Sequence, residues 1–150
     1  MNFLERNYAI TDVETTGRDF RVHEIIEIGL VVVNPGTLEI QNSLEVKVKP
    51  EHIETASAES LQKNGYKPAE WDQAVSLKEA MKKYAGKTKS AIFASYNVTF
   101  DWGFVDEAFH KTGVKDFMDY RRIDILSVAI EKLRAYGFQE FHLEDLCKYF

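Results

Sequence analysis

The spacing of apolar residues changes about one third of the way along the chain, and this change limits the folds that the chain can adopt. Residues 8–13 and 25–33 are apolar runs, and residues 38–48 alternate apolar with polar positions. Both patterns are typical of β-strands. The turn sequence Asn34-Pro35-Gly36 separates the second run from the third,. We therefore expect the first part of the chain to form a three-strand antiparallel meander.

After residue 50, apolar residues recur at helical spacing, and short apolar runs that suit strands lie between the helices,. The helix predicted over 77–84 is expected to end at Gly86,. Further helices are expected over 57–63, over 104–109 with an end at Gly113, over 126–133 with Asp124 as cap, and from 143 onward, and strands over 90–95 and 118–123,. This order predicts one α/β domain, with a mixed sheet that adds parallel strands to the meander and carries helices on both faces.

Composition narrows the class of protein. Apolar residues make up 45% of the 150 residues and charged residues 29%, as in globular domains,. The net charge of −5 argues against nucleic-acid binding by bulk electrostatics alone, although it allows an enzyme that gathers acids around metals,. No apolar run is long enough to cross a bilayer,. The single cysteine, Cys147, is expected in the core of the last helix and fits a cytoplasmic protein,.

Two carboxylates, Asp12 and Glu14, stand at the end of the first predicted strand. Side chains at i and i+2 of a strand point to the same face, so these acids should lie side by side. Paired carboxylates repel each other unless they are protonated or share a cation. The pair therefore indicates a site for a hard divalent cation, Mg²⁺ or Mn²⁺.

A third carboxylate, Asp101, follows the strand predicted over 90–95, at the start of the next helix. By itself, Asp101 could simply favour the helix N-terminus, and Asn97 could be a turn residue. Sites in open α/β sheets gather at strand ends, however. Three acids that converge there could hold two divalent cations for phosphodiester cleavage.

Several segments, in consistent order over nearly the whole chain, resemble the DEDD (DnaQ-like) 3′–5′ exonuclease superfamily. This superfamily includes the proofreading (epsilon) subunit of bacterial DNA polymerase III, RNase T and oligoribonuclease, and the branch of the proofreading subunit is the nearest. Residues 11–17 (TDVETTG) resemble its first motif, 25–29 (IIEIG) its second-strand signature and 97–101 (NVTFD) its second motif. Residues 123–126 and 142–146 resemble later segments of the same family.

The resemblance implies an RNase H-like fold and 3′–5′ hydrolysis of single-stranded nucleic acid, with DNA favoured over RNA. It implies two Mg²⁺ or Mn²⁺ ions bound by Asp12, Glu14 and Asp101,. Four further residues, Thr15, Thr16, Asn97 and Phe100, are the expected contacts of the 3′-terminal nucleotides,. A polymerase, or a second copy of the chain, is the expected protein partner.

The family's third motif, a histidine followed by an aspartate, has no match of the usual spacing. His142 and Asp145 are three residues apart, where the family usually has five, and the leucines around them suggest packing. The chain also ends within an apolar helical stripe. We therefore expect one exonuclease domain over 1–150 that is truncated at its C-terminal end and has little or no activity.

Two other classes of function stay open. Asp12 and Glu14 could serve an aspartyl-phosphate phosphatase, in which the first acid is the nucleophile, but that chemistry would leave the segment 97–101 unexplained,. A nuclease-like module that only binds nucleic acid or a polymerase is the second alternative. The sequence does not decide between DNA and RNA, because no motif contacts the 2′-hydroxyl.

Overall fold

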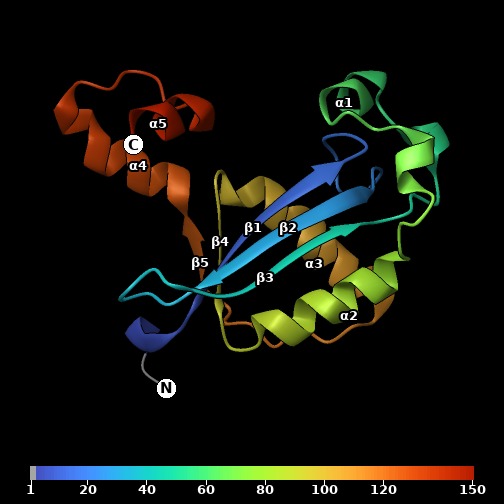
Figure 1. Cartoon of the computed structure of the whole chain (residues 1–150), viewed down its shortest axis with the longest axis horizontal. Helices are drawn as coiled ribbons and strands as arrows, with labels where there is room; N and C mark the ends of the chain where they lie inside the picture. The colour runs from blue at the N-terminus through green and yellow to red at the C-terminus, as the bar shows by residue number, and fades with distance from the viewer. Residues whose placement is uncertain (1–2) are drawn as a thin grey trace.

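The computed structural model describes residues 3–150, which form five strands and five α-helices in the order that Figure 1 shows. The strands are β1 (Tyr8–Thr15), β2 (Ile25–Val33), β3 (Ile40–Lys47), β4 (Ile92–Ser95) and β5 (Arg122–Asp124). The α-helices are α1 (Ala58–Lys63), α2 (Leu77–Thr88), α3 (Val98–Thr112), α4 (Ile125–Leu133) and α5 (Leu143–Tyr149). Short 3₁₀ turns lie at Phe3–Glu5, Ile53–Thr55, Pro68–Trp71 and Arg134–Tyr136. None of the helices in this part of the chain is long and apolar enough to cross a membrane.

All five strands form one mixed sheet with the order β3-β2-β1-β4-β5. β1, β2 and β3 pair antiparallel, which confirms the predicted meander. β4 pairs parallel with β1, and β5 pairs parallel with β4. The carboxyl ends of β1 and β4 therefore lie at the same edge of the sheet.

Helices cover both faces of the sheet, as the sequence predicts. Ala9 and Phe93 are register partners in β1 and β4, and both belong to the core that packs on α2 and α3. Ile92 and Ala94 point to the other face, yet they are also buried,. α4 contacts β4 and lies, with α5, on the side of the sheet away from α2 (Figure 1).

Three details of the predicted elements were wrong. α2 continues past Gly86 to Thr88, because a helix tolerates an exposed glycine and the buried Thr88 hydroxyl donates to the Tyr84 carbonyl (3.0 Å),. The strand expected over 118–123 is shorter and begins only at Arg122. Cys147 is exposed and not in the core, because within α5 only Leu146 is buried.

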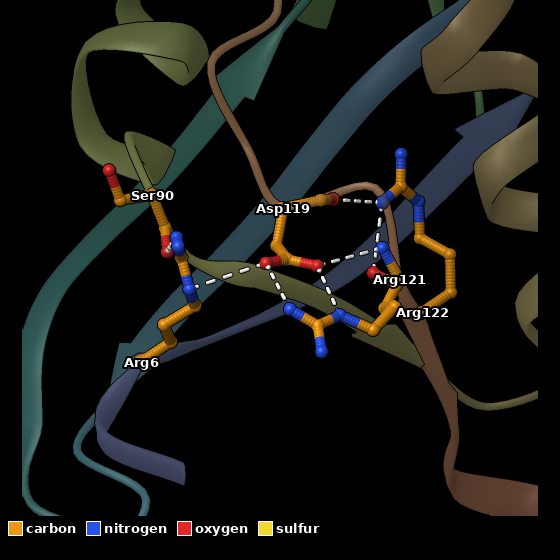
Figure 2. A network of polar contacts seen from close by, with 5 residues as sticks. All are labelled: Arg6, Ser90, Asp119, Arg121 and Arg122. Carbon is orange, nitrogen blue, oxygen red and sulfur yellow. Dashed lines mark hydrogen bonds and ion pairs between the residues drawn. The ribbon is translucent and has the colours of Figure 1, made fainter. Parts of the chain in front are cut away.

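A cluster of arginines around Asp119 connects the segment before β1 to the segment before β5 (Figure 2). The Asp119 side chain is 4% exposed and accepts two hydrogen bonds from the Arg121 guanidinium (2.8 and 3.0 Å). Arg6 Nε lies 3.3 Å from Asp119 Oδ2, which also accepts one of the Arg121 hydrogen bonds, and Arg6 donates to the Ser90 carbonyl (3.1 Å). Arg122 donates to the Asp119 backbone carbonyl. These contacts hold the pKa of Asp119 well below its usual range, chiefly through the hydrogen bonds from Arg121,.

Candidate active site

The end of β1 carries the two acids that the sequence singles out. Val13 is buried on the core face, so Asp12 and Glu14 point to the opposite face, where Asp12 is exposed and Glu14 half-buried,. In the antiparallel pairing with β2, Glu14 faces Glu27. The charges of Asp12 and Glu27 both raise the pKa of Glu14, after the larger effect of burial. The predicted side-by-side placement of the two acids is therefore present in the fold.

Asp101 reaches the same place from the first turn of α3. β4 pairs with β1 only as far as Ile10, so the residues of β1 after Ile10 have no register partner in β4. The Val13 N–H on β1 donates to Asp101 Oδ1 (3.1 Å), and Asp101 is only 3% exposed. The hydrogen bond fixes the third acid against the strand that carries the other two.

The turn between β4 and α3 depends on Asp124. Asn97 has a left-handed backbone conformation (φ 66°), which asparagine tolerates better than most residues,. The N–H groups of Asn97 and Val98 both donate to Asp124 Oδ1 (3.1 Å each), while Asp124 Oδ2 accepts from the Ser127 N–H (3.2 Å). Asp124 is therefore the predicted cap of α4 and also supports the turn that leads to Asp101.

All three acids have pKa values above their ordinary range. The pKa of Asp101 is raised to about 6, chiefly by burial; the charge of Asp12 adds to the rise, and the hydrogen bond from the Val13 N–H opposes it. Burial also raises the pKa of Asp12. Within the described part of the chain, the positive charge of Lys63 lowers the pKa values of both Asp12 and Glu14, and no other cation acts on either acid. Neighbouring acids with raised pKa values are common at sites that bind a cation.

A cavity of about 380 Å³ opens beside these acids. Of the seven residues predicted from the sequence, six line it: Asp12, Glu14, Thr15, Asn97, Phe100 and Asp101. Thr16 does not line the cavity. Its side chain is fully buried, and its hydroxyl accepts a hydrogen bond from the Glu24 N–H (2.8 Å). The Thr15 hydroxyl donates to the Gly17 carbonyl (2.7 Å), so it stabilises the turn after β1.

Gly17 is needed for this turn because another side chain occupies the space beside its α-carbon. A Cβ at this position would lie 2.1 Å from a carbon of the His23 ring. The loop that follows β1 therefore folds back closely on itself, with the His23 N–H donating to the Asp19 carbonyl (2.8 Å). The glycine that ends the first sequence motif thus has a packing role in the site.

Sequence reasoning missed the residues that α1 and its C-terminal cap contribute to the cavity: Glu59, Ser60, Lys63 and Asn64. Arg18, from the loop after β1, and Tyr96 were also missed. α1 reaches the cavity through contacts between distant parts of the chain. The Ser57 N–H donates to the Thr16 carbonyl (2.7 Å), and Asn64 Nδ2 donates to the Thr15 carbonyl (2.8 Å). Neither contact follows from a local pattern.

The pair that most resembles a third motif lies outside the cavity. His142 and Asp145 are exposed and form ion pairs with Glu140 (3.7 Å) and Lys148 (3.3 Å), respectively. None of the four histidines, all of which lie in the described part of the chain, lines the cavity. The cavity therefore offers no imidazole as a general base.

The donor chemistry of the cavity suits a hard divalent cation, because carboxylate oxygens are the ligands that Mg²⁺ and Mn²⁺ prefer. Within residues 3–150, however, no three histidine, cysteine or acidic side chains are close enough together to hold a metal ion. Asp101 instead accepts the Val13 N–H. Metal binding by Asp12, Glu14 and Asp101 would therefore require their side chains to move closer together.

Comparison with known proteins identifies the family. Residues 9–150 match the exonuclease family RNase T. The chain belongs to this exonuclease family. It is 30% identical to the DNA polymerase III PolC-type of Thermotoga maritima over 141 residues, which cover 90% of the chain and 10% of that protein. It is 27% identical to the 3′-5′ exonuclease DinG of Staphylococcus haemolyticus over 126 residues, which cover 81% of the chain and 13% of that protein. The chain thus spans about a tenth of the length of these relatives.

Solved structures support the fold assignment. The crystal structure of E. coli exonuclease I in complex with a dA16 oligonucleotide matches 95% of this chain and 35% of that protein, with a TM-score of 0.77 and 17% identity. A complex of exonuclease I with SSB-Ct matches with a TM-score of 0.74 and 16% identity, over 94% of this chain and 33% of that protein. The chain therefore has the RNase H-like mixed sheet that the sequence predicts.

Proposed function

We propose that this domain removes nucleotides from the 3′ end of single-stranded nucleic acid, with DNA as the favoured substrate. The observation that carries the proposal is the convergence of Asp12, Glu14 and Asp101 at one cavity in a chain of the exonuclease family. Relatives whose names describe a DNA polymerase and a 3′-5′ exonuclease support DNA as substrate and a polymerase as partner.

In the proposed reaction, Asp12, Glu14 and Asp101 would hold two divalent metal ions,. When bound, such ions supply Lewis-acid stabilisation of the phosphate and of the leaving oxygen. Asp12 and Glu14 must be ionised to act as ligands, and Asp101 must lose the proton that its pKa of about 6 lets it hold in weak acid. The half-buried Phe100, packed on Phe104 with ring centroids 5.1 Å apart, gives a face on which a terminal base could stack,.

We expect slow turnover by these 150 residues alone. No histidine lines the cavity, and a general base commonly contributes about 10²–10⁴-fold to a rate,. Robust digestion by the purified chain would contradict this expectation and would require another group to accept the proton.

The test uses a 5′-labelled single-stranded oligonucleotide with excess protein and either Mg²⁺, Mn²⁺ or EDTA. We expect stepwise shortening from the 3′ end with either metal, no shortening in EDTA, and loss of activity in Asp12→Asn. Glu131→Gln is the matched control, since Glu131 is an exposed acid of α4 outside the cavity. The proposal fails if the 3′ end stays intact at every protein concentration, and a metal-independent binder of single strands would then be the better description.

A further inference from the structure

Part of the cavity wall is positively charged, in contrast to the acids at the end of β1. α1 presents Glu59, Ser60, Lys63 and Asn64 to the cavity, at positions i, i+1, i+4 and i+5 of one helix face,. Arg18, from the loop after β1, lies beside them. The cavity therefore contains two cations in addition to its carboxylates.

The position of α1 relative to the acids is fixed at both ends of the helix. Before its first turn, the Ser57 N–H donates to the Thr16 carbonyl (2.7 Å). After its last turn, Asn64 Nδ2 donates to the Thr15 carbonyl (2.8 Å). Thr15 directly follows Glu14 in β1, so the helix that carries Lys63 is attached to the strand that carries the acids.

Both cations are available to a ligand. Lys63 forms no salt bridge with any residue in the part of the chain that the structure describes, although its charge reaches Asp12 and Glu14. Arg18 pairs with Glu59 (3.3 Å), but both side chains are about four-fifths exposed. An exposed ion pair of this kind contributes little stability, so a phosphate can replace Glu59 as the partner of Arg18.

We propose that Lys63 and Arg18 bind phosphate groups of the substrate strand next to the terminal phosphate that the acids address, an inference that rests on the proposed function. Lys63 and Arg18 line the same cavity as the acids, so a strand whose end lies at the acids passes within reach of both cations,. Such contacts carry no base information, so they position any single strand whatever its sequence. The structure thus assigns α1 to holding the strand and β1 and α3 to the chemistry.

The test measures binding of a short single-stranded oligothymidylate by fluorescence anisotropy, with Ca²⁺ in place of Mg²⁺ so that cleavage does not interfere. For single strands, each phosphate contact contributes about 0.7 to the slope of log affinity against log salt concentration. We expect Lys63→Gln and Arg18→Gln each to weaken binding at low salt and to reduce the slope by about 0.7. The loss should be equal for oligothymidylate and oligoadenylate. Lys63→Arg should restore the slope.

Lys67→Gln is the matched control, because it removes the same charge four residues further along the chain, beyond the end of α1. Lys67 pairs with Glu70 (2.8 Å) and does not line the cavity, so its replacement should leave the slope unchanged. If the wild type binds and shortens DNA while Lys63→Gln keeps the full slope, the phosphate contact is wrong and the exonuclease proposal stands. If the slope falls but no 3′ shortening occurs, the contact stands and the exonuclease proposal fails. If the wild type binds no single strand, both are wrong.

Discussion

Asp101 and Asp119 are both buried aspartates, but the charged side chains around Asp101 are acidic and those around Asp119 are basic. Asp101 lies near Asp12 and accepts a hydrogen bond from the Val13 N–H (3.1 Å), and its pKa is raised to about 6, chiefly by burial. Asp119 lies among arginines (Figure 2), and its pKa falls below the usual range. The protein thus leaves one buried carboxylate without a compensating cation and surrounds the other with cations.

This difference is what we expect between the proposed metal site and a structural ion-pair cluster. Ionising a buried acid that has no cation beside it costs free energy. A bound metal ion would offset that cost for Asp101,. An acid already surrounded by guanidinium groups gains nothing further, but it ties the chain before β1 to the loop before β5. Variants of the two regions should therefore affect different measurements.

The largest effect is expected for Glu14→Gln in the cavity. The amide keeps the size of the side chain but is a poor ligand for a hard cation, so the rate of 3′ shortening should fall by at least about 100-fold. The melting temperature should not fall, because the change also removes repulsion from Asp12 and Glu27. Gel assays and thermal melts of the same preparation test both statements. A marked loss of thermal stability would mean that Glu14 has a structural role instead.

Asp119→Asn should have the opposite effect, with a clear loss of stability and no change in Mn²⁺ affinity. The change removes the anion that pairs with Arg6 and accepts two hydrogen bonds from Arg121, and we expect the melting temperature to fall by about 5–10 °C at pH 7,. Because the pKa of Asp119 is lowered in the folded state, its stabilisation is complete above the unfolded pKa of about 3.9,. The gap between variant and wild type should therefore narrow as the pH falls below about 4. A constant gap would contradict an electrostatic origin.

Asp101→Asn should stabilise the metal-free protein in alkaline but not in acidic solution. Ionising the buried Asp101 costs free energy, because its pKa rises from 3.8 to about 6 on folding. This cost appears as the pH rises from about 4 to above 6, so the variant should gain about 1–3 kcal/mol at pH 8 and almost nothing at pH 4. Asparagine Oδ1 can still accept the Val13 N–H. Urea unfolding in EDTA at several pH values measures the difference in free energy of unfolding between variant and wild type. A difference that shrinks as the pH rises would contradict the prediction.

The smallest effect is expected for Arg121→Lys, which separates charge from geometry in the Asp119 cluster. Arginine makes two hydrogen bonds to the carboxylate, whereas lysine can supply the charge but not the planar fork,. Because Arg6 remains in place, we expect the melting temperature to fall by only about 1–3 °C,. A loss as large as that of Asp119→Asn would show that the paired hydrogen bonds, and not the charge, account for the stability.

The sequence predicted those parts of the site that depend on local periodicity. Strand alternation places Asp12 and Glu14 on one face, and a strand followed by a helix start places Asp101 at a strand end. The same logic identified Asp124 as a helix cap. The same reasoning was wrong about Gly86, because an exposed glycine within a helix has the same local pattern as a glycine that ends a helix.

The parts that the sequence did not predict depend on contacts between distant segments. Lys63 is an ordinary surface lysine of a short helix until the carbonyls of Thr15 and Thr16 bring that helix to the cavity. Asp119 likewise gains its role only when Arg6, more than a hundred residues earlier, reaches it. Neither of these contacts between distant segments can be predicted from the spacing of residues in the sequence.

The attachment of α1 has a consequence for how this domain can diverge. On the β1 side, both attachment points are main-chain carbonyls, which every amino acid provides. Substitutions at Glu59, Ser60 or Lys63 can therefore alter the surface that α1 presents to the cavity, while the strand with the acids keeps its geometry. Substitutions at a few positions of one short helix can in this way change the cavity wall without moving Asp12 or Glu14 on β1.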